Sequence, residues 1–292
     1  MNFKNRLNGL LQSFIISLFL FMVAPSAIIG FLISKSTSFP ILILLLIVIA
    51  LYDIGANVLN NYSDWSVDII NKKRNGMHTH TSQKSLLLTY LFLTILLPIP
   101  LFLLHASLYL IISVIFGVFL GIFYSIKIKF KDITPLNYIS IALAYAAIPI
   151  SIGFFSGSAN ISTFTHWLPL IIWMSLVTFS YTITKDYPDI PGDALHNKKT
   201  LPVMFGKHTS IIIQFFLISL SYALLFMFII FGYLPNFLFI TFISFFFAIF
   251  ILNKAYHNES EYGYKKIALY NKINHFTLRM LVILILLIIL YI

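Results

Sequence analysis

Cysteine is absent from this chain of 292 residues, and charged residues make up only 10% of it. The absence of cysteine excludes disulfide bonds, thiolate catalysis and cysteine-ligated metals. The low charge argues against a soluble domain, because a soluble surface needs many more charged side chains. The chain is instead 60% hydrophobic, and this composition is typical of a membrane protein.

Acidic residues are especially few, with nine Asp and Glu against 19 Lys and Arg, which gives a net charge of +10. An excess of basic residues can indicate binding to nucleic acid. Here the sequence contains no soluble basic domain that could bind it. We therefore expect no nucleic-acid partner. The positive charge is better explained by the orientation of the chain in a membrane.

Nine apolar runs have the length of membrane spans, at approximately residues 11–33, 40–60, 85–104, 107–126, 137–156, 165–184, 209–232, 236–253 and 275–291. Runs of about 20 apolar residues cross the bilayer as helices. Backbone groups in lipid must be hydrogen-bonded within the segment, which also favours helices. The sequence predicts an all-α, polytopic membrane protein with nine transmembrane helices.

The basic residues lie mainly on one side of these spans. Of the 19 Lys and Arg, 17 fall in the segments 1–10, 61–84, 127–136, 185–208 and 254–274. Such segments remain in the cytoplasm by the positive-inside rule. We predict a multi-pass integral membrane protein with a cytoplasmic N-terminus and an external C-terminus, located in the inner membrane if the protein is bacterial.

Five of the nine acids are concentrated in two short stretches that resemble each other. The stretches are residues 60–68 (NNYSDWSVD) and 185–193 (KDYPDIPGD). At an offset of 125 positions (189 − 64), the tyrosines match and so do both aspartates of an Asp-x-x-x-Asp pattern. We predict one domain, residues 1–292, in which two related four-helix halves, about 11–126 and 137–253, are followed by a ninth helix.

The first stretch has a helical spacing that places its polar residues on one face of the second span. These residues are Asp53, Asn57, Asn60 or Asn61, Asp64 and Asp68. Carboxylates four residues apart would repel by roughly 0.2–0.5 kcal/mol on an exposed helix, and a divalent cation would reverse that repulsion. In the second stretch, Pro188 and Pro191 predict that the sixth helix breaks.

Both stretches offer only oxygen ligands, which favour a hard cation. Few carboxylates, with room for water and phosphate, favour Mg²⁺ over a Ca²⁺ cage. Basic residues follow each stretch, namely residues 72–74 and residues 198–199, and they indicate that an anion is part of the site. Mg²⁺ between carboxylates and a phosphorylated substrate accounts for both charges. The alternative is that these acids are solvated loop residues paired with neighbouring lysines.

The stretches also resemble signatures of a known family. Asn60-x-x-x-Asp64-x-x-x-Asp68 resembles the first signature of the UbiA superfamily of intramembrane prenyltransferases. Residues 185–193, followed by KTLPV at 199–203 and Gly206, resemble the second. Nine helices with cytoplasmic acidic loops are also similar to this superfamily. The resemblance implies a helical bundle around a lateral cavity, open to lipid, in which an isoprenoid chain lies.

The resemblance implies that two Mg²⁺ ions hold the diphosphate of an allylic isoprenoid while an acceptor attacks the allylic carbocation. It implies catalytic roles for Asp64, Asp68, Asp189 and Asp193. The implied metal ligands are Asn60, Asp64, Asp68, Asp186, Asp189 and Asp193. The residues expected to bind substrate are Arg6, Asn57, Tyr62, Tyr124, one of the loop lysines Lys127, Lys129 and Lys131, and also Lys185 and Lys199.

The acceptor is the part of the reaction that departures from the family pattern affect most. The usual proline after the first signature is missing, Lys127 and Ile128 replace a double proline, and Asn61 stands where Asp is common. We predict an aromatic or quinone-precursor acceptor. One alternative is terpene cyclisation, or transfer to a carotenoid or other non-aromatic acceptor. Another is a cation-coupled transporter with two repeats, although its ions would bind near the bilayer midplane, away from these acids.

Overall fold

The computed structural model describes residues 3–70, 75–258 and 260–291. Within them, nine helical stretches are long and apolar enough to span a membrane. They are Ile16–Ile33, Phe39–Ser63, Gln83–Leu103, Leu108–Lys127, Leu136–Gly157, Leu168–Leu195, Lys207–Ile230, Asn236–Tyr256 and Gly263–Leu290. The predicted all-α class with nine spans is confirmed.

Several spans contain more than one helical element. The first four spans are α2 (Ile16–Leu18), the π-helix η1 (Phe19–Val23) and α3 (Ala24–Ile33); α4 (Phe39–Ser63); α7 (Gln83–Leu96) and α8 (Pro98–Leu103); α9 (Leu108–Ile122) and the π-helix η2 (Phe123–Lys127). The fifth and sixth are α10 (Leu136–Ala142), the π-helix η4 (Leu143–Ala147) and α11 (Ile148–Gly157); α13 (Leu168–Thr182), the 3-10 helix η5 (Ile183–Asp189) and α14 (Ile190–Leu195). The last three are α16 (Lys207–Ile230); the 3-10 helix η6 (Asn236–Thr241) and α17 (Phe242–Tyr256); α18 (Glu261–Tyr291).

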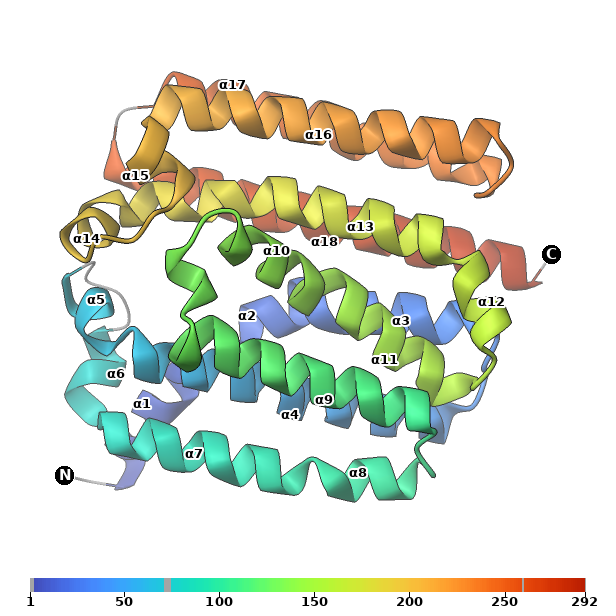
Figure 1. The fold of residues 1–292 in the computed structure, drawn as a ribbon, viewed down its shortest axis with the longest axis horizontal. Coiled ribbons are helices and arrows are strands. Elements are labelled where there is room, and N and C mark those ends of the chain that lie inside the picture. The colour runs from blue at the N-terminus through green and yellow to red at the C-terminus, as the bar shows by residue number, and fades with distance from the viewer. Residues whose placement is uncertain (1–2, 71–74, 259, 292) are drawn as a thin grey trace.

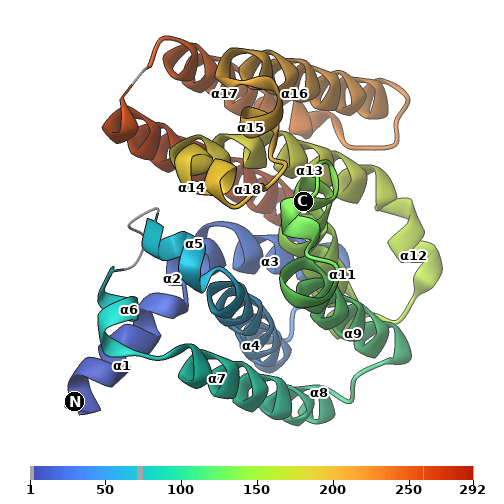
Figure 2. The same ribbon diagram turned by 60° about the vertical axis from the view of Figure 1, so that its left-hand side comes forward.

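Shorter helices connect these spans. They are α1 (Phe3–Ser13), α5 (Trp65–Ile70), α6 (Asn75–His80), the 3-10 turn η3 (Phe130–Asp132), α12 (Ile161–His166) and α15 (Leu201–Phe205). Three of them, α5, α6 and α15, lie at one end of the bundle together with α1 and with α14 of the sixth span, and α18 ends at the opposite end (Figure 1). Figure 2, turned by 60°, shows α5 and α14 facing each other at that end. The two acidic stretches are therefore carried by the same end of the molecule.

Two helix starts differ from the sequence prediction by five residues or more. The first span starts at Ile16 and not at residue 11, because Ile15 has a left-handed backbone (φ 44°) that separates α1 from α2. The ninth helix begins at Glu261, 14 residues before residue 275 (275 − 261). Hydropathy falls at the polar residues of this segment, whereas a helix needs only its backbone hydrogen bonds to continue. The run 275–291 is thus the apolar end of a longer helix.

Close packing of α3 against α11 fixes one wall of the bundle. A Cβ atom at Gly30 would lie 2.0 Å from the Ile150 carbonyl oxygen, and one at Gly153 would lie 2.0 Å from the Ala27 carbonyl oxygen. Only glycine fits at these two positions, and small residues commonly allow such approach between membrane helices. On the same face of α3, Ser26 Oγ donates to the Tyr145 carbonyl oxygen of η4 at 2.8 Å.

Candidate active site

A cavity of about 380 Å³ lies between the spans, and both acidic stretches line it. The first contributes Asn60, Asp64 and Asp68, and the second contributes Asp186, Asp189 and Asp193. Asn57 and Asp53, one and two turns deeper than Asn60 on α4, also line the cavity. The polar face that the helical spacing predicts for the second span therefore faces this cavity.

The first stretch is a helix interrupted at one residue. Asp64 follows the last residue of α4, with φ −93° and ψ 9°, and its backbone N–H donates to the Asn60 carbonyl oxygen at 2.8 Å. The N–H of Asp68 in turn donates to the Asp64 carbonyl oxygen at 2.8 Å. This spacing keeps Asp64 and Asp68 on the cavity side although the helix bends. Asn61 points elsewhere, because its Nδ2 donates to the Ser13 carbonyl oxygen at 2.7 Å.

The second stretch breaks the sixth span, as its prolines predict. The α-helix α13 gives way to the 3-10 turn η5, which contains Pro188, and α14 then starts with Pro191 in its first turn. Asp186 in this turn is buried, and both of its oxygens accept hydrogen bonds. Lys185 Nζ donates to Oδ1 at 2.5 Å, and Tyr138 Oη donates to Oδ2 at 2.7 Å. These contacts tie η5 to α10.

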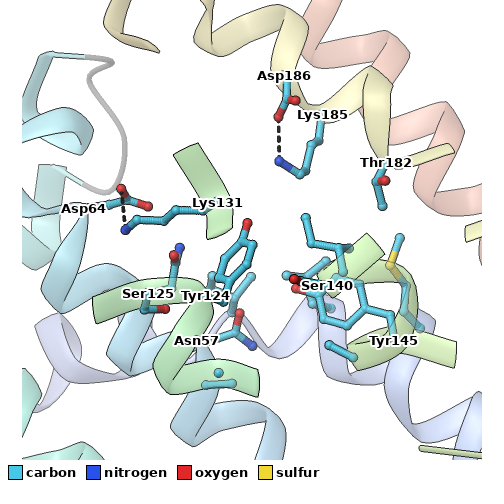
Figure 3. Close-up of a pocket in the computed structure, with 18 of the residues that line it drawn as sticks. Asn57, Asp64, Tyr124, Ser125, Lys131, Ser140, Tyr145, Thr182, Lys185 and Asp186 are labelled. Atoms are coloured by element: carbon cyan, nitrogen blue, oxygen red, sulfur yellow. Dashed lines mark hydrogen bonds and ion pairs between the residues drawn. The ribbon is translucent and has the colours of Figure 1, made fainter. Parts of the chain in front are cut away.

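Asp64 is paired with two lysines that line the cavity. Lys131 Nζ lies 2.9 Å from its Oδ1, and Lys198 Nζ lies 3.1 Å from the same oxygen. Burial opposes ionisation of Asp64, but the two ammonium groups outweigh burial and lower its pKa to about 2. Figure 3 shows the Asp64–Lys131 pair and the Lys185–Asp186 pair on different sides of the cavity, with the Tyr124 ring between them in that view.

Lys198 is the residue that reaches both acidic stretches. Its Nζ lies 3.1 Å from Asp64, 3.5 Å from Asp193 and 4.0 Å from Asp132. Burial opposes its charge, yet Asp64 and Asp193 raise its pKa above the ordinary value. The sequence analysis named the neighbouring Lys199, and not Lys198, among the residues expected to bind substrate. Lys199 is exposed, and its backbone pairs with Ile133 and with the Asp132 carbonyl oxygen at 3.0 Å.

The other residues expected to bind substrate separate into two groups. Asn57, Tyr124, Lys131 and Lys185 line the cavity. Among the three loop lysines, Lys131 is buried beside Asp64, whereas Lys127 and Lys129 are exposed and lie outside the cavity lining.

Tyr62 and Arg6 are the last two residues that the sequence analysis expects to bind substrate, apart from Lys199. Tyr62 also lies outside the cavity lining, and packs against a small cluster formed by Val58, Met77 and Leu86. Arg6 belongs to α1, and its side chain lies outside the part of the chain that the structure describes, as do residues 71–74.

Three π-helical segments contribute to the cavity wall. Met22 comes from η1, Tyr124 and Ser125 come from η2, and Tyr145 comes from η4. A π-helical turn contains an extra residue and is frequently found at functional sites. Hydropathy does not reveal such turns, because a π-helical turn differs from an α-helix in its backbone hydrogen bonds.

Several cavity residues were absent from the sequence prediction of the site. Asp53 was on the predicted polar face but received no role, and Lys198 was noted only as a basic neighbour. Asn271, Lys272 and His275 line the cavity from the ninth helix. Asn271 and Lys272 precede the predicted apolar run 275–291, and His275 begins it, so the sequence placed all three at the edge of a span.

The donor atoms of the site fit a hard metal ion that also binds the substrate. Asn60 Oδ1 is buried and accepts no hydrogen bond within the described residues. In those residues, no group of three His, Cys, Asp or Glu side chains is arranged to hold an ion by itself. Mg²⁺ commonly takes one or two carboxylates and completes its shell with water and phosphate oxygens. The oxygen-only, dispersed donors of this cavity suit that mode of binding.

Comparison with known proteins identifies the family. A digeranylgeranylglyceryl phosphate synthase of Methanoculleus marisnigri is 30% identical over 182 residues, which are 62% of this chain and 63% of that protein. The chain thus matches slightly less than two thirds of the length of that relative. A 2-acyl-4-prenylphloroglucinol 6-prenyltransferase of Humulus lupulus is 29% identical over 191 residues, 60% of this chain and 45% of that protein.

The fold also has solved counterparts. A UbiA homologue from Archaeoglobus fulgidus, bound to DMAPP and Mg²⁺, superposes with a TM-score of 0.70 at 16% identity, over 93% of this chain and 99% of that chain. The pattern of the UbiA prenyltransferase family matches residues 23–276, which include both acidic stretches and seven complete spans. The protein therefore belongs to the UbiA prenyltransferase family, whose enzyme class is prenyl transfer.

Proposed function

We propose that the protein is a Mg²⁺-dependent intramembrane prenyltransferase that moves an isoprenoid group from an allylic diphosphate to a lipophilic acceptor. The observation that carries this proposal is the meeting of both acidic stretches with Lys131, Lys185 and Lys198 in one cavity. Acids and lysines together suit a metal ion and a diphosphate. The relative from Archaeoglobus fulgidus binds DMAPP and Mg²⁺, which supports the same pairing here.

Two Mg²⁺ ions are part of the proposal. Asn60, Asp64 and Asp68 would hold one ion, and Asp189 and Asp193 would hold the other. Asp186 would orient the second stretch, since both of its oxygens already accept hydrogen bonds from Lys185 and Tyr138. When bound, the ions would neutralise the negative charge that grows on the leaving diphosphate.

The lysines would bind the diphosphate, and the apolar wall of the cavity would protect the allylic cation from water. Lys131, Lys185 and Lys198 would donate hydrogen bonds to diphosphate oxygens. The C1–O bond breaks, its electron pair leaves with the diphosphate, and an allylic cation remains. The acceptor then forms a new bond to C1 and releases a proton. Water must be excluded during this step, and the faces of Tyr124 and Tyr145 can stabilise a cation by roughly 0.5–2 kcal/mol each.

The acceptor has two candidate classes. An aromatic or quinone precursor is the class that the sequence favours, and the Humulus lupulus relative carries the name of a phloroglucinol prenyltransferase. A glyceryl phosphate lipid is the second, supported by the name of the Methanoculleus marisnigri relative. The two classes differ in the new bond, because a ring forms a C–C bond and a glyceryl hydroxyl forms a C–O bond.

A direct assay tests the proposal. Purified protein in detergent is incubated with Mg²⁺ and geranylgeranyl diphosphate, first alone and then with homogentisate or geranylgeranylglyceryl phosphate. Acceptor-dependent release of diphosphate, with the matching prenylated product, is the expected result. EDTA should stop the reaction and Mg²⁺ should restore it. Release without any acceptor would favour cyclisation instead, and turnover that persists in metal-free buffer would contradict the metal mechanism.

We also propose that α1 and both acidic stretches face the cytoplasm, since 17 of the 19 Lys and Arg lie in segments on that side. The chain lacks cysteine, so single cysteines report orientation without background. Asn197→Cys should react with a membrane-impermeant maleimide only in inverted vesicles. Ser36→Cys, in the loop between the first two spans, should react only in right-side-out vesicles. The reverse pattern would overturn this orientation.

A further inference from the structure

A buried arginine lies deep in the bundle and has only neutral hydrogen-bond partners. Arg279 on α18 has no exposed surface. Its Nε donates to Ser26 Oγ at 2.8 Å, and its Nη2 donates to Thr178 Oγ1 at 3.0 Å and to the Tyr145 carbonyl oxygen at 3.3 Å. Its Nη1 reaches the carbonyl oxygen of His275 at 3.3 Å and the ring Nδ1 at 2.9 Å. None of these five bonds goes to a carboxylate.

The contact with His275 determines where the imidazole carries its proton. A guanidinium can only donate hydrogen bonds, so Nδ1 of His275 must accept the bond from Arg279. In the neutral ring the proton is then on Nε2. The positive charge next to the ring also disfavours a second proton on it. Arg279 therefore makes His275 a donor at Nε2.

The Nε2 of this ring has no hydrogen-bond partner among the residues that the structure describes. His275 is fully buried and lines the cavity, and its Nε2 forms no hydrogen bond within the described residues. The ring is also packed against Tyr181, with the two rings nearly perpendicular (87°) and their centroids 4.4 Å apart. A buried donor without a partner costs free energy, which a ligand oxygen in the cavity would recover.

The depth of His275 restricts which ligand can supply this oxygen. The ring of Tyr181 packs against His275, and Thr178 is bonded to Arg279. Tyr181 and Thr178 are five and eight residues before Asp186 (186 − 181 and 186 − 178), or about 8 and 12 Å along a helix that rises 1.5 Å per residue. His275 therefore lies deeper in the bundle than the aspartates. Asp64, in contrast, follows directly after the end of its span at Ser63. A diphosphate at the aspartates would lie near the surface, and an isoprenoid tail contains no oxygen.

We propose that His275 Nε2 donates a hydrogen bond to an oxygen of the acceptor substrate, and that Arg279 is the positioning residue that holds the required tautomer. This inference rests on the proposed prenyl transfer and names the part of the cavity that recognises the acceptor. The guanidinium behind the ring makes Nε2–H a stronger donor to an oxygen that carries negative charge. The acceptor class is therefore one with an acidic oxygen, such as a ring carboxylate, a phenolate or a phosphate ester.

A purely structural role of the network predicts a different pattern of mutant effects. Arg279 joins α18 to α3, η4 and α13 through Ser26, Tyr145 and Thr178. If this connection were its only role, removing any partner would lower stability without changing the affinity for the acceptor. Thr178 lies outside the cavity lining, so Thr178→Val is the matched control for a change at His275.

The experiment compares His275→Leu, His275→Asn, His275→Gln and Thr178→Val in detergent. Gln can place an N–H near the position of Nε2, whereas Asn reaches only the position of Nδ1 and Leu has no donor. Homogentisate and geranylgeranylglyceryl phosphate are the two acceptors. The first readout is the rise in melting temperature that each acceptor causes without Mg²⁺ or diphosphate. The second is KM for the acceptor and for geranylgeranyl diphosphate in the complete reaction.

The expected result is that Leu and Asn abolish the acceptor-induced shift and raise acceptor KM roughly tenfold, the effect of losing a hydrogen bond to a charged oxygen. KM for geranylgeranyl diphosphate should stay unchanged, and Gln should recover most of the loss. Thr178→Val should lower the melting temperature but keep the acceptor shift. The acceptor that shows this pattern identifies the source of the oxygen.

Several outcomes would overturn the assignment of His275. They are an unchanged acceptor shift in Leu or Asn, an equal loss in Thr178→Val, and a wild-type protein that binds neither acceptor. If Leu does not fold, Asn still decides the question. A wild-type protein that shows the His275-dependent shift but releases no diphosphate would contradict prenyl transfer alone, so the two proposals fail separately.

Discussion

The two acidic stretches match in sequence, but different parts of the protein hold them. Asp64 of the first stretch is paired with Lys131 and Lys198, which are 67 and 134 residues further along the chain. Asp186 of the second is held by its neighbour Lys185 and by the phenol of Tyr138. The first carboxylate is thus neutralised by distant loops, and the second is fixed locally and to α10. A similar motif therefore does not imply a similar environment.

This difference suggests a division of work between the stretches. In the proposed reaction, Mg²⁺ and the diphosphate would replace the ion pairs that Lys131 and Lys198 form with Asp64. Asp186 is tied more rigidly, because Tyr138 Oη also accepts a hydrogen bond from the Leu201 N–H at 3.0 Å. The whole turn η5 is then oriented before substrate arrives.

The predicted relation between the two halves of the chain stays a prediction.

The largest expected effect is the loss of activity when either stretch loses a carboxylate. Asp64→Asn and Asp189→Asn should each lower kcat on the order of 10²- to 10³-fold, since each removes charge that offsets the leaving group. Radiolabelled prenyl transfer measures the effect. Asp132→Asn, outside the cavity lining, is the control and should retain most activity. Wild-type turnover in either variant would contradict the metal assignment.

The second effect is on stability and should separate the two stretches. Asp64→Asn leaves Lys131 and Lys198 without their shared counter-charge, and breaking a buried pair in this way costs about 3 kcal/mol or more. Asp186→Asn keeps an oxygen for Tyr138 and should cost about 1 kcal/mol. Thermal unfolding in detergent without Mg²⁺ compares the two variants. Equal losses of melting temperature would show that the first stretch is not specially dependent on its lysines.

A third effect tests the contact between the stretches. Lys198→Met should raise KM for the allylic diphosphate roughly 10- to 100-fold, because a charge-assisted hydrogen bond contributes about 1.5–3 kcal/mol. Lys199→Met changes the exposed neighbour in the same way and should alter KM by less than about threefold, as surface substitutions usually do. Steady-state kinetics at saturating acceptor measure both. The opposite ranking would restore Lys199 as the binding residue.

The smallest effect concerns acid pH. The pKa of Asp64 is lowered to about 2 in the folded protein, against about 3.9 in an unfolded chain. The stabilisation from its ion pairs is thus complete above about pH 4 and is lost as the pH falls through about 2. Melting temperatures of the wild type and Asp64→Asn, measured without Mg²⁺, should converge over this interval. A constant difference down to pH 2 would show that another group is responsible.

The sequence predicted the spans and the acidic face well because both depend on local spacing. Asn57, Asn60, Asp64 and Asp68 line the cavity at the helical positions expected for them. Lys198 lines the cavity and Lys199 does not. Which of the two faces the cavity depends on how the loop pairs with Ile133, a contact between distant segments. The spacing of basic residues contains no information about such pairing.

Residues of the ninth helix were missed for a related reason. His275 sits at the start of an apolar run, where sequence alone cannot distinguish a buried side chain from one at the membrane surface. Its burial follows from the Arg279 network, whose partners lie on three other elements. Tertiary packing thus decides the role of polar residues inside a span.

The reach of Lys198 has a consequence for how the protein is made. A ribosome completes the first acidic stretch well before residue 198, which follows Asp64 by 134 positions. During that interval four further spans enter the membrane, and Asp64 can pair only with Lys131 once that loop has been synthesised. The site therefore closes late in biosynthesis, after the sixth span, and a chain that stops earlier carries an acidic stretch that lacks its second cation.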